Sequence, residues 1–542
     1  MSSDLRSVRR RCRGYFLVAL AICGAPVVVA ESGLQQVSIG GEVRIRGHVW
    51  ENVFNDALPS GAVPPVLRWP GSQLPGRAIG DVVGGPCVYS YRDWDDAGSN
   101  LSSVAQRTAI HVQADFTQEV TTFIELDAYR VFGQDFRSNY VTGVDGLNLG
   151  DGDVDVYQAY VEARDLWGLP LQLRVGRQEL NIGGGWLLGN GDALSEFTML
   201  SFDAIRLTYT QDRFSLDAFW SKLGENSGIE QDGDVDFSGV YARYAFSPAF
   251  NLDAYWFLLR DGRAGTLGDC GCTDEVRPAD AAVLLLSDVD YDPTYLNTVG
   301  VRGAGEQGAW DYEVELAYQF GPADQLGSLF RRRLVGDDEA RFDAFAAHAE
   351  VGYTIDSRWS TRVYLRGAYF EGEDHRAVSF RDWQNPFSQP TASISFNRLF
   401  SNNPYSEILD HMGQMSNFWT VQAGVELSLT EKVSTQLSVA HFETVEAFDQ
   451  PLHVRLNGQR LAPFPGLPFL TDESSSDMGW EAALKVAYRY SDDLEFSVGW
   501  SHLFTGDGLY EGNYSDLNGL LFNGGTGRDD ADYFYAQALI RF

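Results

Sequence analysis

One pattern recurs along most of this chain: segments of about ten residues in which apolar and polar side chains alternate. Clear examples lie at residues 42–49, 310–319 and 419–429. In the second of these, one face is apolar, with Trp310, Tyr312, Val314, Leu316 and Tyr318, and the other carries Asp311, Glu313, Glu315 and Gln319. Such period-two alternation predicts β-strands. A soluble β-sandwich alternates as well, so the alternation alone does not choose between a soluble sheet and a membrane barrel.

The connections between these segments alternate between short and long, and about eighteen segments can be counted. The short connections lie near residues 117–120, 165–169, 211–213, 247–249, 304–308, 355–358, 430–432 and 490–493. The long ones lie near 55–104, 132–152, 181–199, 223–234, 260–294, 320–340, 371–416, 443–477 and 504–530. Outer-membrane barrels have short periplasmic turns and longer extracellular loops. We therefore predict an all-β fold, a transmembrane antiparallel β-barrel of about 18 strands with both chain ends in the periplasm.

Lipid requires such a sheet to close, because backbone groups cannot stay unpaired in hydrocarbon. A barrel of about eighteen strands encloses a lumen wide enough for water. Such a pore would leak unless loops fold into it. We expect the long connections 55–104 and 371–416 to plug or gate the lumen.

The first thirty residues are predicted to be a cleaved signal peptide, which leaves residues 31–542 as a single barrel domain. Five arginines precede the apolar segment 15–25, and the small residues before Glu31 suit cleavage after Ala30. A twin-arginine signal and a lipoprotein site at Cys23 fit less well, since the flanking residues differ from those motifs. Beyond the signal, no apolar run approaches the eighteen residues of a spanning helix.

Composition and charge support a membrane barrel and exclude one class of partner. Fifty-six glycines and 13% aromatic residues suit strands bordered by aromatic girdles and joined by Gly-rich loops. Removing the signal peptide, with its five arginines and one aspartate, changes the formal net charge from −34 to −38. Nucleic acid is excluded as a partner, because phosphate binding needs clustered positive charge.

The chain ends on a strand with Phe534, Ala536, Ala538, Ile540 and Phe542 on one face. A terminal strand that stops at a phenylalanine resembles the signal that the barrel-assembly machinery recognises on outer-membrane proteins. The alternative is an ordinary final strand that happens to end in an aromatic residue.

If the apolar faces meet lipid, the polar faces line the lumen. The basic residues placed there are Arg44, Arg46, Arg107, Arg174, Arg206, Arg302, Arg362, Arg366, Lys485 and Arg489. The same parity sends inward the acids Glu42, Asp115, Glu125, Asp127, Glu162, Asp217, Asp253, Asp311, Glu313, Glu315, Glu350, Glu426, Glu481 and Glu495. Each arginine therefore either binds substrate or pairs across neighbouring strands and braces the wall. Arg44 with Arg46, and Arg362 with Arg366, are the pairs we expect to form a cluster.

Residues 173–190 (LRVGRQELNIGGGWLLGN) and 201–209 (SFDAIRLTY) resemble the alginate-export outer-membrane channel family. Residues 362–374 and 396–400 and the strand after Asn417 extend the similarity, which covers about two thirds of the mature chain. The resemblance implies an eighteen-stranded monomeric barrel whose arginine-rich constriction conducts an anionic polyuronate. Arginine suits that task because its planar guanidinium pairs with a carboxylate through two hydrogen bonds and keeps its charge.

The long loops raise two further possibilities. The sequence DGDVD at 151–155 and 232–236 is partly similar to a calcium loop but lacks the glycine at position six. A solvated acidic rim, bridged by divalent ions to lipopolysaccharide, is the alternative. Cys87, Cys270 and Cys272 either tie two external loops together by one disulfide or remain free thiols.

The predicted function is an outer-membrane channel that exports an anionic polysaccharide. The main rival is a general or substrate-selective uptake porin on the same barrel, because the lumen carries charges of both signs. We expect no cofactor, metal site or enzymatic activity, since none of the eight histidines lies in a recognisable nucleophile motif.

Overall fold

The computed structural model describes residues 33–52, 101–117, 119–132, 154–191, 199–225, 234–262, 293–323, 341–372, 393–409, 415–447, 475–508 and 530–542, together with short strands within 449–473 and 514–522. Among these residues, no helix is both long enough and apolar enough to cross a membrane. The one helical element named below is a single 3-10 turn, Leu166–Gly168.

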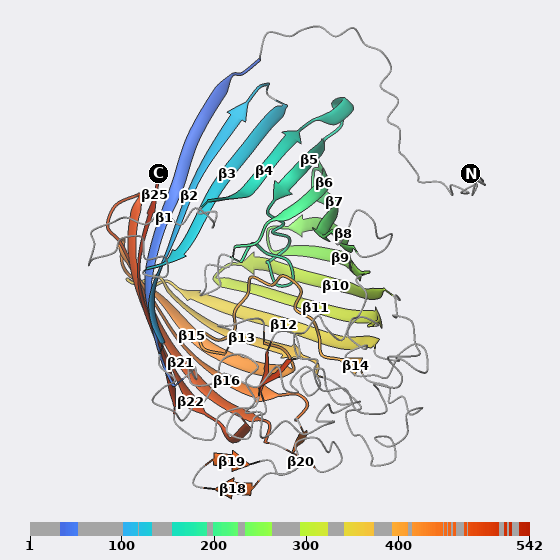
Figure 1. Ribbon diagram of the computed structural model, residues 1–542. Helices are drawn as coiled ribbons and strands as arrows, with labels where there is room; N and C mark the ends of the chain where they lie inside the picture. Colours follow the sequence, from blue (N-terminus) through green and yellow to red (C-terminus); the bar gives the residue numbers. More distant parts are fainter. Residues whose placement is uncertain are drawn as a thin grey trace, which may run out of the picture.

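Eighteen strands form one closed antiparallel barrel (Figure 1). They are β1 (Gln36–Glu51), β2 (Leu101–Asp115), β3 (Val120–Val131), β4 (Asp155–Ala163), β5 (Leu171–Gln178), β6 (Phe202–Gln211), β7 (Phe214–Gly224), β8 (Val235–Ser247), β9 (Phe250–Asp261), β10 (Thr294–Gln307), β11 (Trp310–Pro322), β12 (Arg341–Ile355), β13 (Thr361–Phe370), β15 (Phe418–Thr430), β16 (Val433–Thr444), β21 (Asp477–Arg489), β22 (Leu494–Thr505) and β25 (Ala531–Arg541). The predicted fold class and strand number are confirmed.

Each strand pairs with its neighbours in the chain, and β1 closes the ring by pairing with both β2 and β25. The short strand β14 (Ser393–Ile394) pairs in parallel with the first two residues of β12. Three further pairs lie in the long connections: β17 (Asp449–Pro451) with β20 (Thr471–Glu473), β18 (Val454–Leu456) with β19 (Gln459–Leu461), and β23 (Tyr514–Asp516) with β24 (Leu520–Phe522).

The two ends of the barrel differ, as the spacing predicts. At one end, which we call the short-turn end, β6 and β7 are joined by two residues, as are β8 and β9, β10 and β11, and β15 and β16. The long connections leave the opposite end, which we call the loop end. β1 begins and β25 finishes at the short-turn end, uppermost in Figure 1.

The outer face of the wall is apolar, and the alternation places the polar side chains inside. On β11, Val314 is 45% and Leu316 is 40% exposed, whereas the intervening Glu315 is only 4% exposed. This pattern confirms the parity inferred from residues 310–319. An outer face of exposed aliphatic and aromatic residues is what contact with hydrocarbon requires.

One assumption made from the sequence fails at the loop end, where apolar residues also point inward. The lumen-facing aromatic residues there are Phe202, Phe219, Phe237, Phe257, Phe342, Phe370, Phe418 and Phe442, each at most 5% exposed. They bury an apolar cluster inside the barrel, so the rule that apolar side chains meet only lipid is wrong for this part of the wall. These aromatic residues pack against parts of two long connections, residues 179–191 and 395–409, that lie inside the barrel.

Candidate functional site

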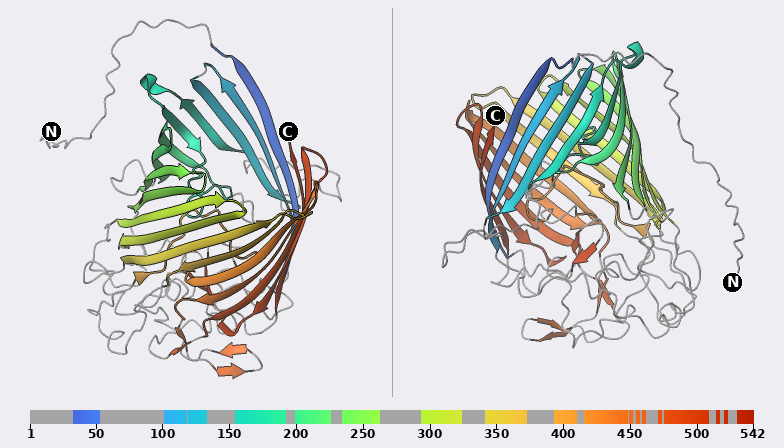
Figure 2. Two further views of the ribbon diagram at one scale, coloured as in Figure 1. Left: turned by 180° about the vertical axis from the view of Figure 1, so that it is seen from behind. Right: turned by 45° about the horizontal axis from the view of Figure 1, so that its top comes forward.

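Two segments fold back into the barrel and pack against each other, and we call them together the plug. They are residues 179–191, after β5, and residues 395–409, before β15 (Figures 1 and 2). Backbone hydrogen bonds join them: the amides of Gly189, Phe400 and Asn402 donate to the carbonyls of Phe400, Leu187 and Gly185 at 2.8–3.0 Å. The predicted plugging by 371–416 is confirmed for this part of that connection. The contribution of 179–191 was not predicted.

Apolar contacts fix the plug to the wall. Trp186 is 1% exposed, and its ring lies 5.7 Å from that of Phe370 on β13 and 6.4 Å from that of Phe396. The Trp186 indole N–H donates to the Tyr405 hydroxyl at 2.8 Å, which in turn lies 3.0 Å from His348 Nδ1 on β12. The plug is therefore packed like a protein core rather than lying loosely in the pore.

Polar contacts continue this attachment around the wall. Gln319 on β11 bonds both the carbonyl and the amide of Asn397 at 2.7 Å. Arg366 donates to the Asn403 side chain and the Pro404 carbonyl. On the other side, Glu481 of β21 accepts from Ser406 and from the Glu407 amide, and Lys485 pairs with Glu407 at 2.5 Å. Arg366 and Lys485, both predicted to line the lumen, thus hold the plug.

Between the plug and the short-turn end, the lumenal wall carries alternating charges on successive strands. Arg243 on β8 lies directly opposite Asp253 on β9. Asp253 lies opposite Arg302 on β10, and Arg302 lies opposite Glu315 on β11. Unlike charges in direct cross-strand positions stabilise a sheet. This row comes from four strands that only the register brings together.

Arg302 is the centre of this row. It pairs with Asp253 at 2.9 Å and with Glu313 at 2.6 Å, and its Nε lies 3.8 Å from Glu315. Asp253 also accepts from the Tyr241 hydroxyl. The predicted bracing role therefore describes Arg302 well.

Arg362 on β13 makes a similar cluster with Asp311 at 2.5 Å, Glu350 at 2.7 Å and Glu426 at 3.4 Å. Arg366 reaches the same Glu350 at 3.9 Å. Arg362 and Arg366 therefore lie beside one common carboxylate, and their expected role in binding substrate stays a prediction.

The other expected pair, Arg44 with Arg46, does not cluster in the same way. Arg44 lies opposite Arg107 of β2, and both arginines pair with Glu42, at 3.0 and 3.5 Å. Arg46 instead bonds Gln537 at 2.9 Å and lies over the Tyr535 ring.

A second cross-strand arginine pair joins β5 and β6, where Arg174 lies opposite Arg206. The two positive charges would repel each other, but each is paired with a carboxylate: Arg174 with Glu162 at 2.6 Å and Arg206 with Asp217 at 2.7 Å. Arg489 stands apart: it lies at the short-turn end of β21, exposed, opposite Glu495.

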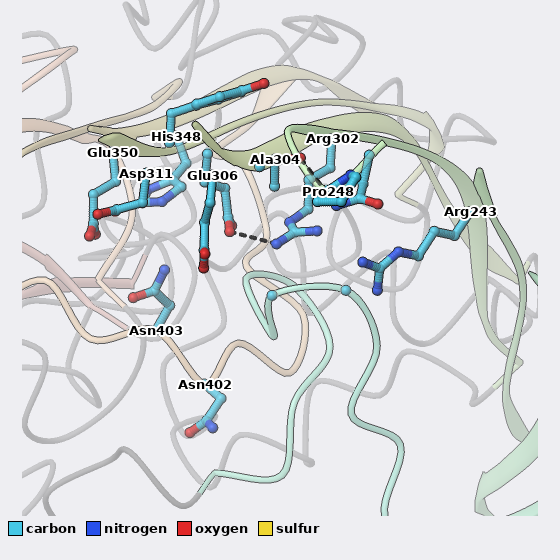
Figure 3. A pocket seen from close by; sticks show the side chains of 16 residues that line it. Arg243, Pro248, Arg302, Ala304, Glu306, Asp311, His348, Glu350, Asn402 and Asn403 are labelled. Atoms are coloured by element: carbon cyan, nitrogen blue, oxygen red, sulfur yellow. Dashed lines mark hydrogen bonds and ion pairs between the residues drawn. The ribbon is translucent and has the colours of Figure 1, made fainter. Parts of the chain in front are cut away.

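A cavity of about 670 Å³ lies between the plug and the wall of β8–β12 (Figure 3). Its charged lining residues are Arg243, Arg302, Glu306, Asp311, Glu313 and Glu350, and Gly183, Gly184, Asn402 and Asn403 of the plug also line it. Arg243 and Glu306 are not among the lumenal residues predicted from the sequence. The period-two parity that placed Arg302 inside applies equally to Glu306 on the same strand, and to Arg243 after Tyr241.

The sequence profile of the alginate export family matches residues 90–521. This chain belongs to the alginate export family. The resemblance seen in its sequence motifs is thereby confirmed.

Solved structures similar to this alginate export family member include Acinetobacter baumannii OccAB1, at 11% identity and a TM-score of 0.48, covering 93% of this chain and 96% of that one. Pseudomonas aeruginosa OccK8 (OprE) is 9% identical with a TM-score of 0.47, covering 94% and 99%. Pseudomonas aeruginosa OpdK with vanillate is 10% identical with a TM-score of 0.45, covering 93% and 98%. No curated protein sequence matches the chain.

Several sequence predictions fall outside the described residues. These are the signal peptide, residues 55–100 of the first long connection, Cys87, Cys270 and Cys272, and the first residues of each DGDVD segment, 151–153 and 232–233. Within the described ranges, no group of three or more histidine, cysteine or acidic side chains is arranged to hold a metal ion.

Proposed function

We propose that this protein is a channel in the outer membrane of a Gram-negative bacterium and that it passes an anionic polysaccharide of the alginate-like polyuronate class. The observation that carries the proposal is the family match over residues 90–521 on a closed barrel with an apolar outer face and a charged interior. A wet, charged lumen inside an apolar wall is the arrangement by which barrels conduct polar solutes.

Arginines that keep part of their side chain exposed are the groups proposed to contact the polymer. Arg174, Arg206 and Arg362 are 24%, 20% and 19% exposed while each is bound to a wall carboxylate. A uronate can take the place of that carboxylate, so one charge-assisted hydrogen bond is exchanged for another. Because each contact is replaceable, the polymer is guided without being trapped.

The remaining predicted partners follow from the same proposal. The barrel-assembly machinery would read the terminal strand ending at Phe542, and lipid and lipopolysaccharide would cover the outer face. We propose that the channel acts as a monomer; because β25 pairs back onto β1, the barrel offers no open sheet edge with which a second copy could pair.

A second candidate, selective uptake of small solutes, is favoured by one specific observation. The lining of the cavity beneath the plug includes the four acids Glu306, Asp311, Glu313 and Glu350 but only two arginines, Arg243 and Arg302. Excess negative charge in a restricted lumen opposes a polyanion and favours cations.

The experiment that separates the two is ion selectivity of the refolded full-length chain in a planar bilayer under a salt gradient, followed by addition of polyuronate. The polysaccharide proposal expects anion preference and block of the current by the polymer. Arg362→Gln should raise the blocking concentration by about tenfold, as for loss of a charge-assisted contact. Arg358→Gln, in the turn of the same hairpin, is the matched control. Cation preference without block would overturn the polyuronate proposal and leave uptake on an intact barrel.

A further inference from the structure

The cavity between the plug and the wall of β8–β12 is partly enclosed. The plug backbone at Gly183 and Gly184 and the side chains of Asn402 and Asn403 cover it on one side, and β8–β12 form its wall (Figure 3). A Cβ at Gly184 would lie 2.7 Å from the Glu313 carboxylate, so glycine permits this close approach. At about 670 Å³, the space suits one small solute rather than a passing chain.

Most charges of the cavity are already neutralised by the wall. Arg302 is held between Asp253 and Glu313, at 2.9 and 2.6 Å. Asp311 and Glu350 are both held by Arg362, at 2.5 and 2.7 Å. These groups stiffen the site and still offer carboxylate lone pairs to a ligand.

The guanidinium of Arg243 is available to a ligand. Its side chain is 49% exposed, and its only ion-pair contact among the described residues is Asp253 Oδ1, 3.7 Å from Arg243 Nε. That distance is beyond a hydrogen bond. Asp253 gives its other oxygen to Arg302 and Tyr241. In Figure 3 the Arg243 side chain extends from β8 into the cavity.

The carboxylate of Glu306 is the second available charge. Among the described residues it has no ion pair and accepts no side-chain hydrogen bond, and it lies directly opposite Asp311 on the neighbouring strand. Like charges in that position repel, and Arg362 compensates Asp311 but forms no ion pair with Glu306 among the described residues. A cation placed beside Glu306 would therefore pair with the acid that the wall leaves uncompensated. Glu306 enters the cavity from β10, whereas Arg243 enters from β8, with Arg302 between them in the view of Figure 3.

We infer that this cavity binds a small solute carrying both an ammonium group and a carboxylate, in the manner of an amino acid. The ammonium would lie against Glu306 and the carboxylate against Arg243, while the amides of Asn251, Asn402 and Asn403 hydrogen-bond the remainder. A simple anion would satisfy Arg243 but approach four carboxylates, and a simple cation would meet Arg243 unpaired. This ligand class goes beyond the polymer channel proposed above.

The test uses the refolded full-length protein in detergent and saturation-transfer NMR with ω-amino acids from glycine to 6-aminohexanoate as probes. We expect binding to peak at the chain length that spans Arg243 and Glu306. The matched carboxylic acid without the amine, and the amine without the carboxylate, should each bind about tenfold more weakly, since each loses one charge-assisted contact. Equal binding of the plain acid and the amino acid would overturn the inference, as would absence of binding by every probe.

Three variants make the assignment specific. Arg243→Gln and Glu306→Gln should each weaken the best probe by about tenfold. Glu495→Gln, an inward-facing residue of β22 opposite Arg489, should leave its binding unchanged. Unchanged binding in Arg243→Gln and Glu306→Gln would overturn the site. Block of the channel by polyuronate, measured on the same preparation, is independent: if block persists while the probes fail to bind, this inference fails and the channel proposal stands.

Discussion

Replacing Trp186 by alanine tests whether the plug is held by packing. The indole is 1% exposed, lies against Phe370 and Phe396, and donates to Tyr405. Truncating a buried tryptophan to alanine costs about 3–5 kcal/mol. The cost falls on the docked plug, because the barrel ladders do not use this side chain.

Since about 1.4 kcal/mol changes an equilibrium tenfold, the undocked fraction of the plug should rise by roughly a hundredfold to a few thousandfold. The amides of Gly189, Phe400 and Asn402 are hydrogen-bonded only while the two segments are docked on each other. Their hydrogen exchange, measured by mass spectrometry on plug peptides, should accelerate by the same factor. Exchange in the strands of the wall should stay at the wild-type rate.

Two controls separate packing from other effects. Trp186→Phe keeps a ring in the cluster and loses the bond to Tyr405, so it should accelerate plug exchange by only about tenfold. Trp220→Ala removes an indole that is 45% exposed on the outer face and should leave the plug unchanged. If Trp186→Ala left plug exchange at the wild-type rate, the conclusion that apolar packing holds the plug would be refuted.

Substitutions at three further positions should change the stability or the assembly of the barrel. Gly176 has φ 128°, and a Cβ there would lie 2.2 Å from the Ala159 carbonyl oxygen, so Gly176→Ala should lower the unfolding temperature markedly, at a cost of about 2 kcal/mol or more. Gly47→Ala, whose Cβ has only ordinary contacts, should leave that temperature nearly unchanged. Arg302→Met leaves the buried carboxylates of Asp253 and Glu315 without their arginine and should destabilise the barrel by about 3–5 kcal/mol in a heat-modifiability assay. Phe542→Ser should reduce the folded barrel recovered in outer-membrane fractions severalfold; undiminished recovery would show that the terminal aromatic is not read during assembly.

The strands, their number and, where an apolar face alternates with a charged one, the direction of their side chains were predictable from the sequence. On residues 310–319 an apolar side chain alternates with a polar one because lipid lies on one side of the wall and a polar lumen on the other. The motifs at residues 173–190 and 201–209 also indicated the family. Both signals are local, since each comes from residues that are close together in the chain.

Pairing of the charges required the register of the barrel. Parity places Arg302 inside, yet its partners Asp253 and Glu313 come from neighbouring strands whose relative shift no local pattern reveals. In the same way Arg44 meets Arg107 of the next strand, after a long connection, rather than acting with Arg46. The sequence therefore provides the set of lumenal charges but not their neighbours.

The plug depended most on tertiary structure. Ile182, Leu187 and Leu188 lie in a Gly-rich connection with no strand or helix period, and Phe237 and Phe370 face inward on strands whose outer faces are apolar too. Which apolar face meets lipid and which meets the plug is decided only when both connections fold back between the strands. The sequence by itself determined a closed barrel with a charged lumen. The tertiary structure decided where that lumen is filled, because buried apolar area is shared among segments far apart in the chain.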